Sequence, residues 1–294
     1  MRYLHCSDVH VTDDYARRQL LRLGWRRWIA MAELQLGGRA RRFAHAEEML
    51  RRIARDAEGL GVDHLVVSGD LTAYSMPDEF TRARAALAPW VESPARATVI
   101  PGNHDRYTPG ALSSRRFESS FGQLLSSDIP ELAVEDGFPV VRLLGERDAV
   151  VGLCSARVPR FPGMSFGVIG QAQLQALKHL VADPRLAGRA VLVAVHHAPF
   201  KANGQPDRPS HGLVDAEAML TLLPGPRFAV LHGHIHHRFH HPATASRPHI
   251  FGAGSSTEAG DEGYWVLETA DGQLSSARAL RPQPVMPAAV AGTA

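Results

Sequence analysis

The chain has 294 residues, of which 45% are hydrophobic, and a formal net charge of +2. This length can bury a sizeable core, and the near-neutral balance gives no indication of a nucleic-acid-binding or membrane-surface protein as a whole. Cys6 and Cys154 both lie in apolar runs, so we expect buried thiols and no disulfide framework. The sequence shows no signal-peptide-like apolar stretch and no run of about 18 apolar residues, which favours a cytoplasmic location.

Short apolar runs alternate with helical patterns along the chain. Strands are predicted at 3–6, 64–67, 97–100, 140–144, 149–154, 190–195, 228–231, 248–253 and 264–268. Apolar spacings of three and four predict helices at 43–60, 78–90, 170–182 and 215–223. This order predicts an α/β fold of two stacked mixed β-sheets flanked by helices, formed by a single domain of residues 1–280. Residues 281–294, with three prolines and small side chains, predict a flexible tail.

Five of the predicted strands end in side chains that can bind metal ions. In chain order these side chains are Asp8, His10, Asp70, Asn103, His196, His234 and His236. Ligands of open α/β sheets bind outside the carboxyl ends of the strands, which is where these residues are expected. Two carboxylates, an amide and four imidazoles, without a thiolate, suit two divalent ions such as Mn²⁺, Fe²⁺ or Zn²⁺ better than a structural zinc.

The pattern resembles the five sequence blocks of the calcineurin-like metallophosphoesterases. The blocks are Asp8-Val9-His10, Gly69-Asp70, Gly102-Asn103-His104-Asp105, His196 and Gly233-His234-Ile235-His236, spread over residues 1–259. The resemblance implies that Asp8, His10 and His236 bind one ion, that Asn103, His196 and His234 bind the other, and that Asp70 bridges the two.

The same resemblance implies a catalytic role for His104, which stands next to a ligand but outside the ligand set. In the family a histidine at this place stabilises the transition state and protonates the leaving group, while a hydroxide between the two ions attacks the phosphorus. Asp105 is predicted to orient His104 or another group of the site.

Each single residue also has a simpler interpretation. A buried polar group or a helix cap explains a lone histidine or asparagine more often than a metal site does. Their joint occurrence in the order of the family favours the site. His197, His232 and His237 are interpreted as groups behind the ligands or on the surface, and His240 and His241 as surface residues.

Residues 17–42 form a basic segment, with eight arginines and the single acid Glu33. On a helical wheel one face collects Leu21, Trp25, Trp28, Ile29, Ala32 and Leu36. We interpret the segment as a helical insertion at about 15–42 between the first block and the first core helix. It could pack beside the site, attract an anionic substrate, or make peripheral contact with an anionic surface such as the inner membrane.

The sequence predicts a phosphodiester hydrolase acting on a small anionic substrate, with no nucleic acid as partner. The segments GDLTAYSMPDEF and PGNHDRY resemble the class III cyclic-nucleotide and glycerophosphodiester phosphodiesterases. The tryptophan-bearing basic segment favours an alternative, a pyrophosphohydrolase of a lipid-linked UDP-sugar at the membrane. A DNA nuclease is a further alternative, although no other basic stripe supports it. A non-catalytic scaffold, a role that this fold has in the retromer complex, would not need the complete ligand set.

Overall fold

The computed structural model describes residues 1–12, 39–106, 108–159, 161 and 163–283. Most of the predicted insertion at 15–42 and of the predicted tail therefore lies outside the described residues. From the insertion the structure describes the short helix α2 (Arg39–Arg42). No helix in the described ranges is both long and apolar enough to cross a membrane.

The first sheet has five strands in the order β11-β10-β1-β2-β3. They are β1 (Arg2–Cys6), β2 (His64–Val67), β3 (Ala97–Val99), β10 (Tyr264–Ala270) and β11 (Gln273–Leu280). β1, β2 and β3 are parallel, and the register pairs Cys6 with Val67 and Val67 with Val99. The segments that follow these three strands therefore leave the sheet at the same edge.

The second sheet has six strands in the order β4-β5-β6-β7-β9-β8. They are β4 (Val140–Leu144), β5 (Asp148–Gly152), β6 (Ala190–Ala194), β7 (Phe228–His232), β8 (Arg238–His241) and β9 (His249–Ala253). The four inner strands are parallel, and β4 and β8 run antiparallel at the two edges. Ala194 pairs with Leu231, so the residues after β6 and β7 also emerge side by side.

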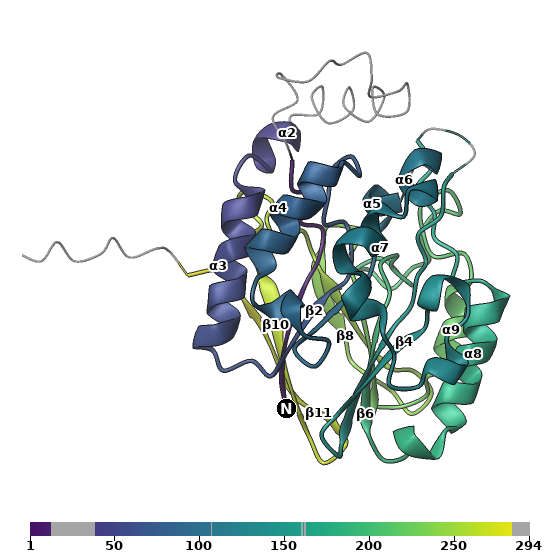
Figure 1. The fold of residues 1–294 in the computed structure, drawn as a ribbon. Coiled ribbons are helices and arrows are strands. Elements are labelled where there is room, and N and C mark those ends of the chain that lie inside the picture. Colours follow the sequence, from purple (N-terminus) through teal and green to yellow (C-terminus); the bar gives the residue numbers. More distant parts are fainter. Residues whose placement is uncertain (13–38, 107, 160, 162, 284–294) are drawn as a thin grey trace, which may run out of the picture.

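Helices cover the outer faces of the two stacked sheets (Figure 1). α3 (Ala46–Gly59) and α4 (Pro77–Leu87) lie on one side, and α8 (Gln171–Ala182) and α9 (Ala216–Thr221) on the other. The larger core cluster joins both sheets with α3 and α4 and includes Ile53 and Leu192, whereas a second cluster packs α8 and α9 against β6 through Val193. The predicted fold class is confirmed.

Most predicted elements are present within a few residues of the predicted ends. The short helices α5 (Asn103–Arg106), α6 (Pro109–Ser113) and α7 (Arg116–Phe121) were not predicted, because segments of four to six residues carry no measurable periodicity. Short 3₁₀ turns occur at Trp90–Glu92, Gly122–Leu125, Pro130–Leu132, Glu135–Gly137 and Pro184–Leu186. Strands β8 and β11 were missed as well. As expected, Cys6 and Cys154 are buried free thiols.

Candidate metal centre

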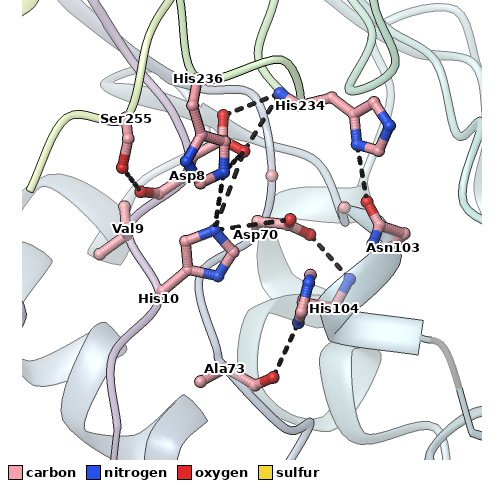
Figure 2. Close-up of polar contacts among 12 residues, drawn as sticks. Asp8, Val9, His10, Asp70, Ala73, Asn103, His104, His234, His236 and Ser255 are labelled. Atoms are coloured by element: carbon pink, nitrogen blue, oxygen red, sulfur yellow. Dashed lines mark hydrogen bonds and ion pairs between the residues drawn. The ribbon is translucent and has the colours of Figure 1, made fainter. Parts of the chain in front are cut away.

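The loops after β1, β2, β3, β6 and β7 bring the predicted ligands together. Figure 2 shows these ligands apart from His196, whose Nε2 lies 3.0 Å from Asn103 Oδ1. These five strands are divided between the two sheets: β1, β2 and β3 belong to the first sheet, and β6 and β7 to the second. The candidate centre therefore lies where the carboxyl ends of two sheets converge, so its geometry depends on how the sheets are stacked.

Five of the seven predicted ligands have left-handed backbone conformations. Their φ angles are 52° at Asp8, His10 and Asp70, 72° at His234 and 49° at His236. Such angles are uncommon for residues other than glycine, although aspartate and histidine tolerate them better than most, and each costs about 1 to 3 kcal/mol. The surrounding hydrogen bonds hold them: Val9 and His10 both donate their N–H to the Asp70 carbonyl, at 2.8 and 2.9 Å.

Asp8, His10 and His236 form one group of potential ligands. The Nε2 atom of His236 lies 3.3 Å from Asp8 Oδ1 and 3.3 Å from His10 Nε2, and His10 Nε2 lies 3.9 Å from Asp8 Oδ1. The backbone N–H of His234 donates to Asp8 Oδ2 at 2.9 Å, which ties the loop after β7 to the loop after β1. Ligand atoms of one divalent ion lie about 3 to 4 Å apart, so this group fits an ion.

Asn103, His196 and His234 form a second group on the other side of Asp70. The Oδ1 atom of Asn103 lies 3.0 Å from both His196 Nε2 and His234 Nδ1. Asp70 Oδ2 stands between the groups, 3.4 Å from His196 Nε2 and 3.8 Å from His10 Nε2. This single oxygen is close to both sets of donors, as the predicted bridging role requires.

Both carboxylates of the centre are almost completely buried, with exposed fractions of 0% for Asp8 and 2% for Asp70. Burial alone would raise the pKa of the Asp70 carboxyl, but the His196 and His104 imidazoles reverse that shift and hold the pKa well below its usual range. At Asp8 the effect of burial is likewise reversed, mainly by His236, which lowers the pKa to about 2. Both groups are therefore anionic at neutral pH, as a cation site requires.

The imidazoles divide into two kinds. Burial lowers the pKa of His10 to about 3 and that of His234 well below its usual range, so both rings are neutral and offer a lone pair. At His196 burial acts in the same direction, but Asp70 outweighs it and raises the pKa to about 9. The His196 proton thus supplies positive charge next to Asp70, and a bound cation would replace it. The chemistry of the donor set fits divalent ions.

His104 is the second residue of the short helix α5 and lies beside the carboxylate that stands between the groups. Its backbone N–H donates to Asp70 Oδ1 at 2.7 Å, and its Nδ1 is 2.8 Å from the Ala73 carbonyl (Figure 2). A ring nitrogen of His104 also lies within 4.8 Å of ligand atoms of His10 and Asp70. Its position suits both a catalytic group and an additional ligand.

The Asp105 carboxylate is hydrogen-bonded to the loops after β2 and β3. Its Oδ2 accepts N–H bonds from Gly102 at 2.9 Å and Leu71 at 3.2 Å, and its Oδ1 accepts the N–H and the hydroxyl of Thr72 at 3.0 and 2.9 Å. This carboxylate therefore holds the two ligand-bearing loops to each other. Among the contacts of the described residues, the partner of His104 Nδ1 is the Ala73 carbonyl and not Asp105.

The remaining histidines take different places. His197 and His232 are fully buried behind the ligands, and His197 Nδ1 lies 2.8 Å from the Ser155 hydroxyl. His237 is exposed. His240 and His241 were interpreted as surface residues, but both are half-buried in the edge strand β8, and the His240 ring stacks on Phe251 with centroids 4.1 Å apart.

Residues 255–258, which follow β9, support the centre and were missed in the sequence. The hydroxyls of Ser255 and Thr257 donate to the carbonyls of Asp8 and Val9, at 2.9 and 2.6 Å. Glu258 Oε2 is 3.1 Å from His236 Nδ1. The sequence did contain a signal for these residues, because the segment Gly254-Ser255-Ser256-Thr257-Glu258 is one more polar cluster directly after a predicted strand.

Glu258 links a ligand to the segment that enters the core from the insertion. Its Oε1 accepts a hydrogen bond from Arg42 Nη1 at 2.8 Å, and its other oxygen faces His236. The hydrogen bond with His236 is the main reason why the pKa of Glu258 is lowered to about 2. A carboxylate that accepts the Nδ1 proton fixes the tautomer of the ring and leaves Nε2 for a metal ion.

Glu258→Gln should weaken the binding of one divalent ion by about 10- to 100-fold, because a neutral amide holds the His236 tautomer less firmly. The second ion and the melting temperature of the metal-free protein should change little. Calorimetric titration with Mn²⁺ measures both affinities. Glu217→Gln is the matched control. Glu217 also pairs with an arginine, Arg247, at 3.2 Å, but it contacts none of the ligands. Two wild-type affinities in Glu258→Gln would contradict this role.

Comparisons with known proteins identify the fold and the family of the chain. No curated protein sequence matched the chain. A dimetal phosphatase from Danio rerio is structurally similar, with a TM-score of 0.58 and 14% identity over 96% of this chain and 99% of that one. A purple acid phosphatase from yellow lupin seeds has a TM-score of 0.52 and 11% identity over 95% of this chain and 53% of that one. These likenesses show the fold. The model of the calcineurin-like phosphoesterase family matches residues 1–238, so the chain belongs to that family.

Proposed function

We propose that the chain hydrolyses a small anionic phosphodiester with two divalent ions, with His104 as the general acid. As a member of its family the chain is a phosphoesterase with a dinuclear centre of divalent ions. The observation that carries the proposal is that seven ligand side chains from five strand ends converge, with one of them, Asp70, between the two groups and His104 beside it. Mn²⁺, Fe²⁺ and Zn²⁺ all suit this donor set.

The two ions, when bound, stabilise the charge on the phosphate and lower the pKa of a coordinated water. The chain itself supplies the position of these ions. Asp8, His10 and His236 would hold one ion, Asn103, His196 and His234 the other, and Asp70 would contact both. Because strained loops and buried hydrogen bonds hold the ligands, the site needs little rearrangement when the ions and the substrate bind.

The proposed general acid is held at two points. The backbone N–H of His104 is bonded to Asp70, and Nδ1 of the ring to the Ala73 carbonyl, so the ring has one orientation relative to the bridging carboxylate. With a proton retained on Nδ1, the protonated ring would donate its Nε2 proton to the departing alkoxide. The preference for a diester rests on the resemblance of residues 69–80 and 101–107 to the class III phosphodiesterases.

The purified protein should contain two divalent ions per chain and hydrolyse bis-p-nitrophenyl phosphate faster than p-nitrophenyl phosphate. Elemental analysis and release of p-nitrophenol with Mn²⁺ present measure these two properties. A chelator should abolish turnover, and added Mn²⁺ should restore it. At most one tightly bound ion in excess Mn²⁺, together with no turnover, would refute the proposed function. A faster monoester reaction would move the assignment to a phosphomonoesterase.

Two substitutions separate metal binding from proton transfer. Asp70→Ala should lose metal and activity together, because one of its oxygens is close to both ligand groups. His104→Ala should keep both ions and lose about 10²- to 10⁴-fold in kcat, the usual effect of a general acid. The measurement compares metal content with kcat on a diester that has a poor leaving group. Loss of an ion in His104→Ala would make His104 a ligand, and a wild-type rate would remove it from the mechanism.

The second candidate is a pyrophosphohydrolase of a lipid-linked UDP-sugar, which the basic tryptophan-bearing segment 17–42 favours. In that case Trp25 and Trp28 would enter the membrane interface, and each nearby arginine would contribute about 1 kcal/mol at an anionic surface. We favour the soluble diester and a cytoplasmic protein, because the sequence has no other membrane signal. In that case the same apolar face packs on the core, as apolar stripes usually do.

Trp25→Ala/Trp28→Ala tests this choice. If the apolar face packs on the core, the variant should lose about 3 kcal/mol of stability, and neither protein should sediment with anionic vesicles at low salt. Circular dichroism melting and vesicle co-sedimentation give the two readouts. Salt-sensitive vesicle binding by the wild type that disappears in a variant with an unchanged melting temperature would instead support the lipid pyrophosphohydrolase.

A further inference from the structure

A cavity of about 750 Å³ lies beside the candidate metal centre, and the ligands His234 and His236 form part of its wall. Most of the other residues that line it belong to the loop between β6 and α9, including Lys201 and Arg208. A volume of this size holds a small-molecule group and not only a water. A substrate whose phosphate is bound at the centre could therefore extend into this cavity.

The wall of the cavity is polar and lacks large apolar groups. Among the described residues that line it, only Ala202 and Ile235 have apolar side chains, and none has a phenyl, phenol or indole ring. Lipid chains and stacked bases are normally bound by large apolar or aromatic side chains. The wall therefore suits a charged or strongly polar group better than an acyl chain or a nucleobase.

The charges of the wall favour an anion. Asp207 is the one acidic residue among the described lining residues, and its two oxygens are already occupied. Oδ1 accepts the N–H of Arg208 at 2.7 Å, and Oδ2 lies 2.6 Å from His211 Nδ1. The cations Lys201 and Arg208 have no side-chain ion pair or hydrogen bond in the described part of the chain. The wall thus has two cations and one acid, and the carboxylate of that acid is already bonded to residues of its own loop.

His211 connects this wall to the metal centre. Its carbonyl is 2.9 Å from His234 Nε2, and the two rings lie 4.1 Å apart between centroids. The Asp207–His211 pair therefore fixes the loop that carries Lys201 and Arg208 relative to a candidate ligand. A group bound by the two cations would be held in a defined position relative to the scissile phosphate.

We propose that this cavity binds a second anionic group of the substrate, a phosphate or carboxylate separated from the scissile phosphate, through Lys201 and Arg208. The proposal rests on the proposed phosphodiesterase function and narrows its substrate class. The preferred substrates are diesters that carry an additional negative charge on the arm that lies in the cavity. Neutral alcohols and purely apolar arms should be poorer.

Binding of two nucleotides to the Mn²⁺-loaded protein tests the subsite without requiring turnover. Thymidine 3′,5′-bisphosphate differs from thymidine 5′-phosphate by one phosphate group. The wild type should bind the bisphosphate at least about 10-fold more tightly in calorimetric titrations, as expected for charge-assisted hydrogen bonds. In Lys201→Ala/Arg208→Ala this preference should fall to less than about 2-fold, whereas Lys201→Arg/Arg208→Lys should retain most of it.

The control is Arg55→Ala/Lys178→Ala, which removes the same charge from two exposed residues that do not line the cavity. It should keep the wild-type preference. Equal binding of both nucleotides by the wild type, or the same loss of preference in the control, would overturn the subsite. Hydrolysis of bis-p-nitrophenyl phosphate separates the two proposals: turnover without a binding preference removes the subsite alone, and a preference without turnover removes the proposed function.

Discussion

The burial of two carboxylates at one point is the constraint on which the rest of the structure depends. Asp8 and Asp70 are nearly inaccessible, and two buried negative charges destabilise a fold by several kcal/mol each unless cations and hydrogen bonds compensate them. The chain supplies this compensation from both sheets. The N–H of His234 donates to Asp8, that of His104 donates to Asp70, and Nε2 of His196 lies 3.4 Å from Asp70 Oδ2. The loops that carry the ligands thus also supply the groups that compensate the charges of Asp8 and Asp70. A bound divalent ion would compensate the remaining negative charge.

How far the sequence predicts this arrangement depends on whether the signal is local. Buried parallel strands appear as apolar runs, and the polar residues after each run follow directly, so the ligands could be found from the chain alone. The assignment of strands to sheets could not be predicted from the sequence, because β1 and β6 have the same local pattern but belong to different sheets. The edge strand β8 was missed because its sequence, Arg-Phe-His-His, has no apolar run, and only its pairing with β9 makes it a strand.

Supporting residues are harder to predict than ligands. Asp105 lies within a recognised block, and the sequence predicted that it orients His104 or another group of the site; its carboxylate bonds the backbone of Leu71, Thr72 and Gly102. An acid beside a catalytic histidine looks the same in the sequence whether it bonds the ring or the neighbouring loop. Arg42 and Glu258 are 216 residues apart along the chain, and nothing local marks them as partners. Such residues become visible only when the fold brings their side chains together.

The contacts of Arg42 and Phe43 place the end of the basic segment at the centre itself. Phe43 is buried, and its ring lies 4.8 Å from that of His10 and 6.2 Å from that of His236, between centroids. Arg42 pairs with Glu258, which in turn faces His236. Phe43, the residue that follows the insertion, therefore packs against two ligands of one ion, and Arg42, the last residue of the insertion, reaches one of them through Glu258. A substitution at Arg42 or Phe43 would change metal binding and the end of the insertion together, so the role of the insertion is better tested through Trp25 and Trp28, which stand earlier in the sequence.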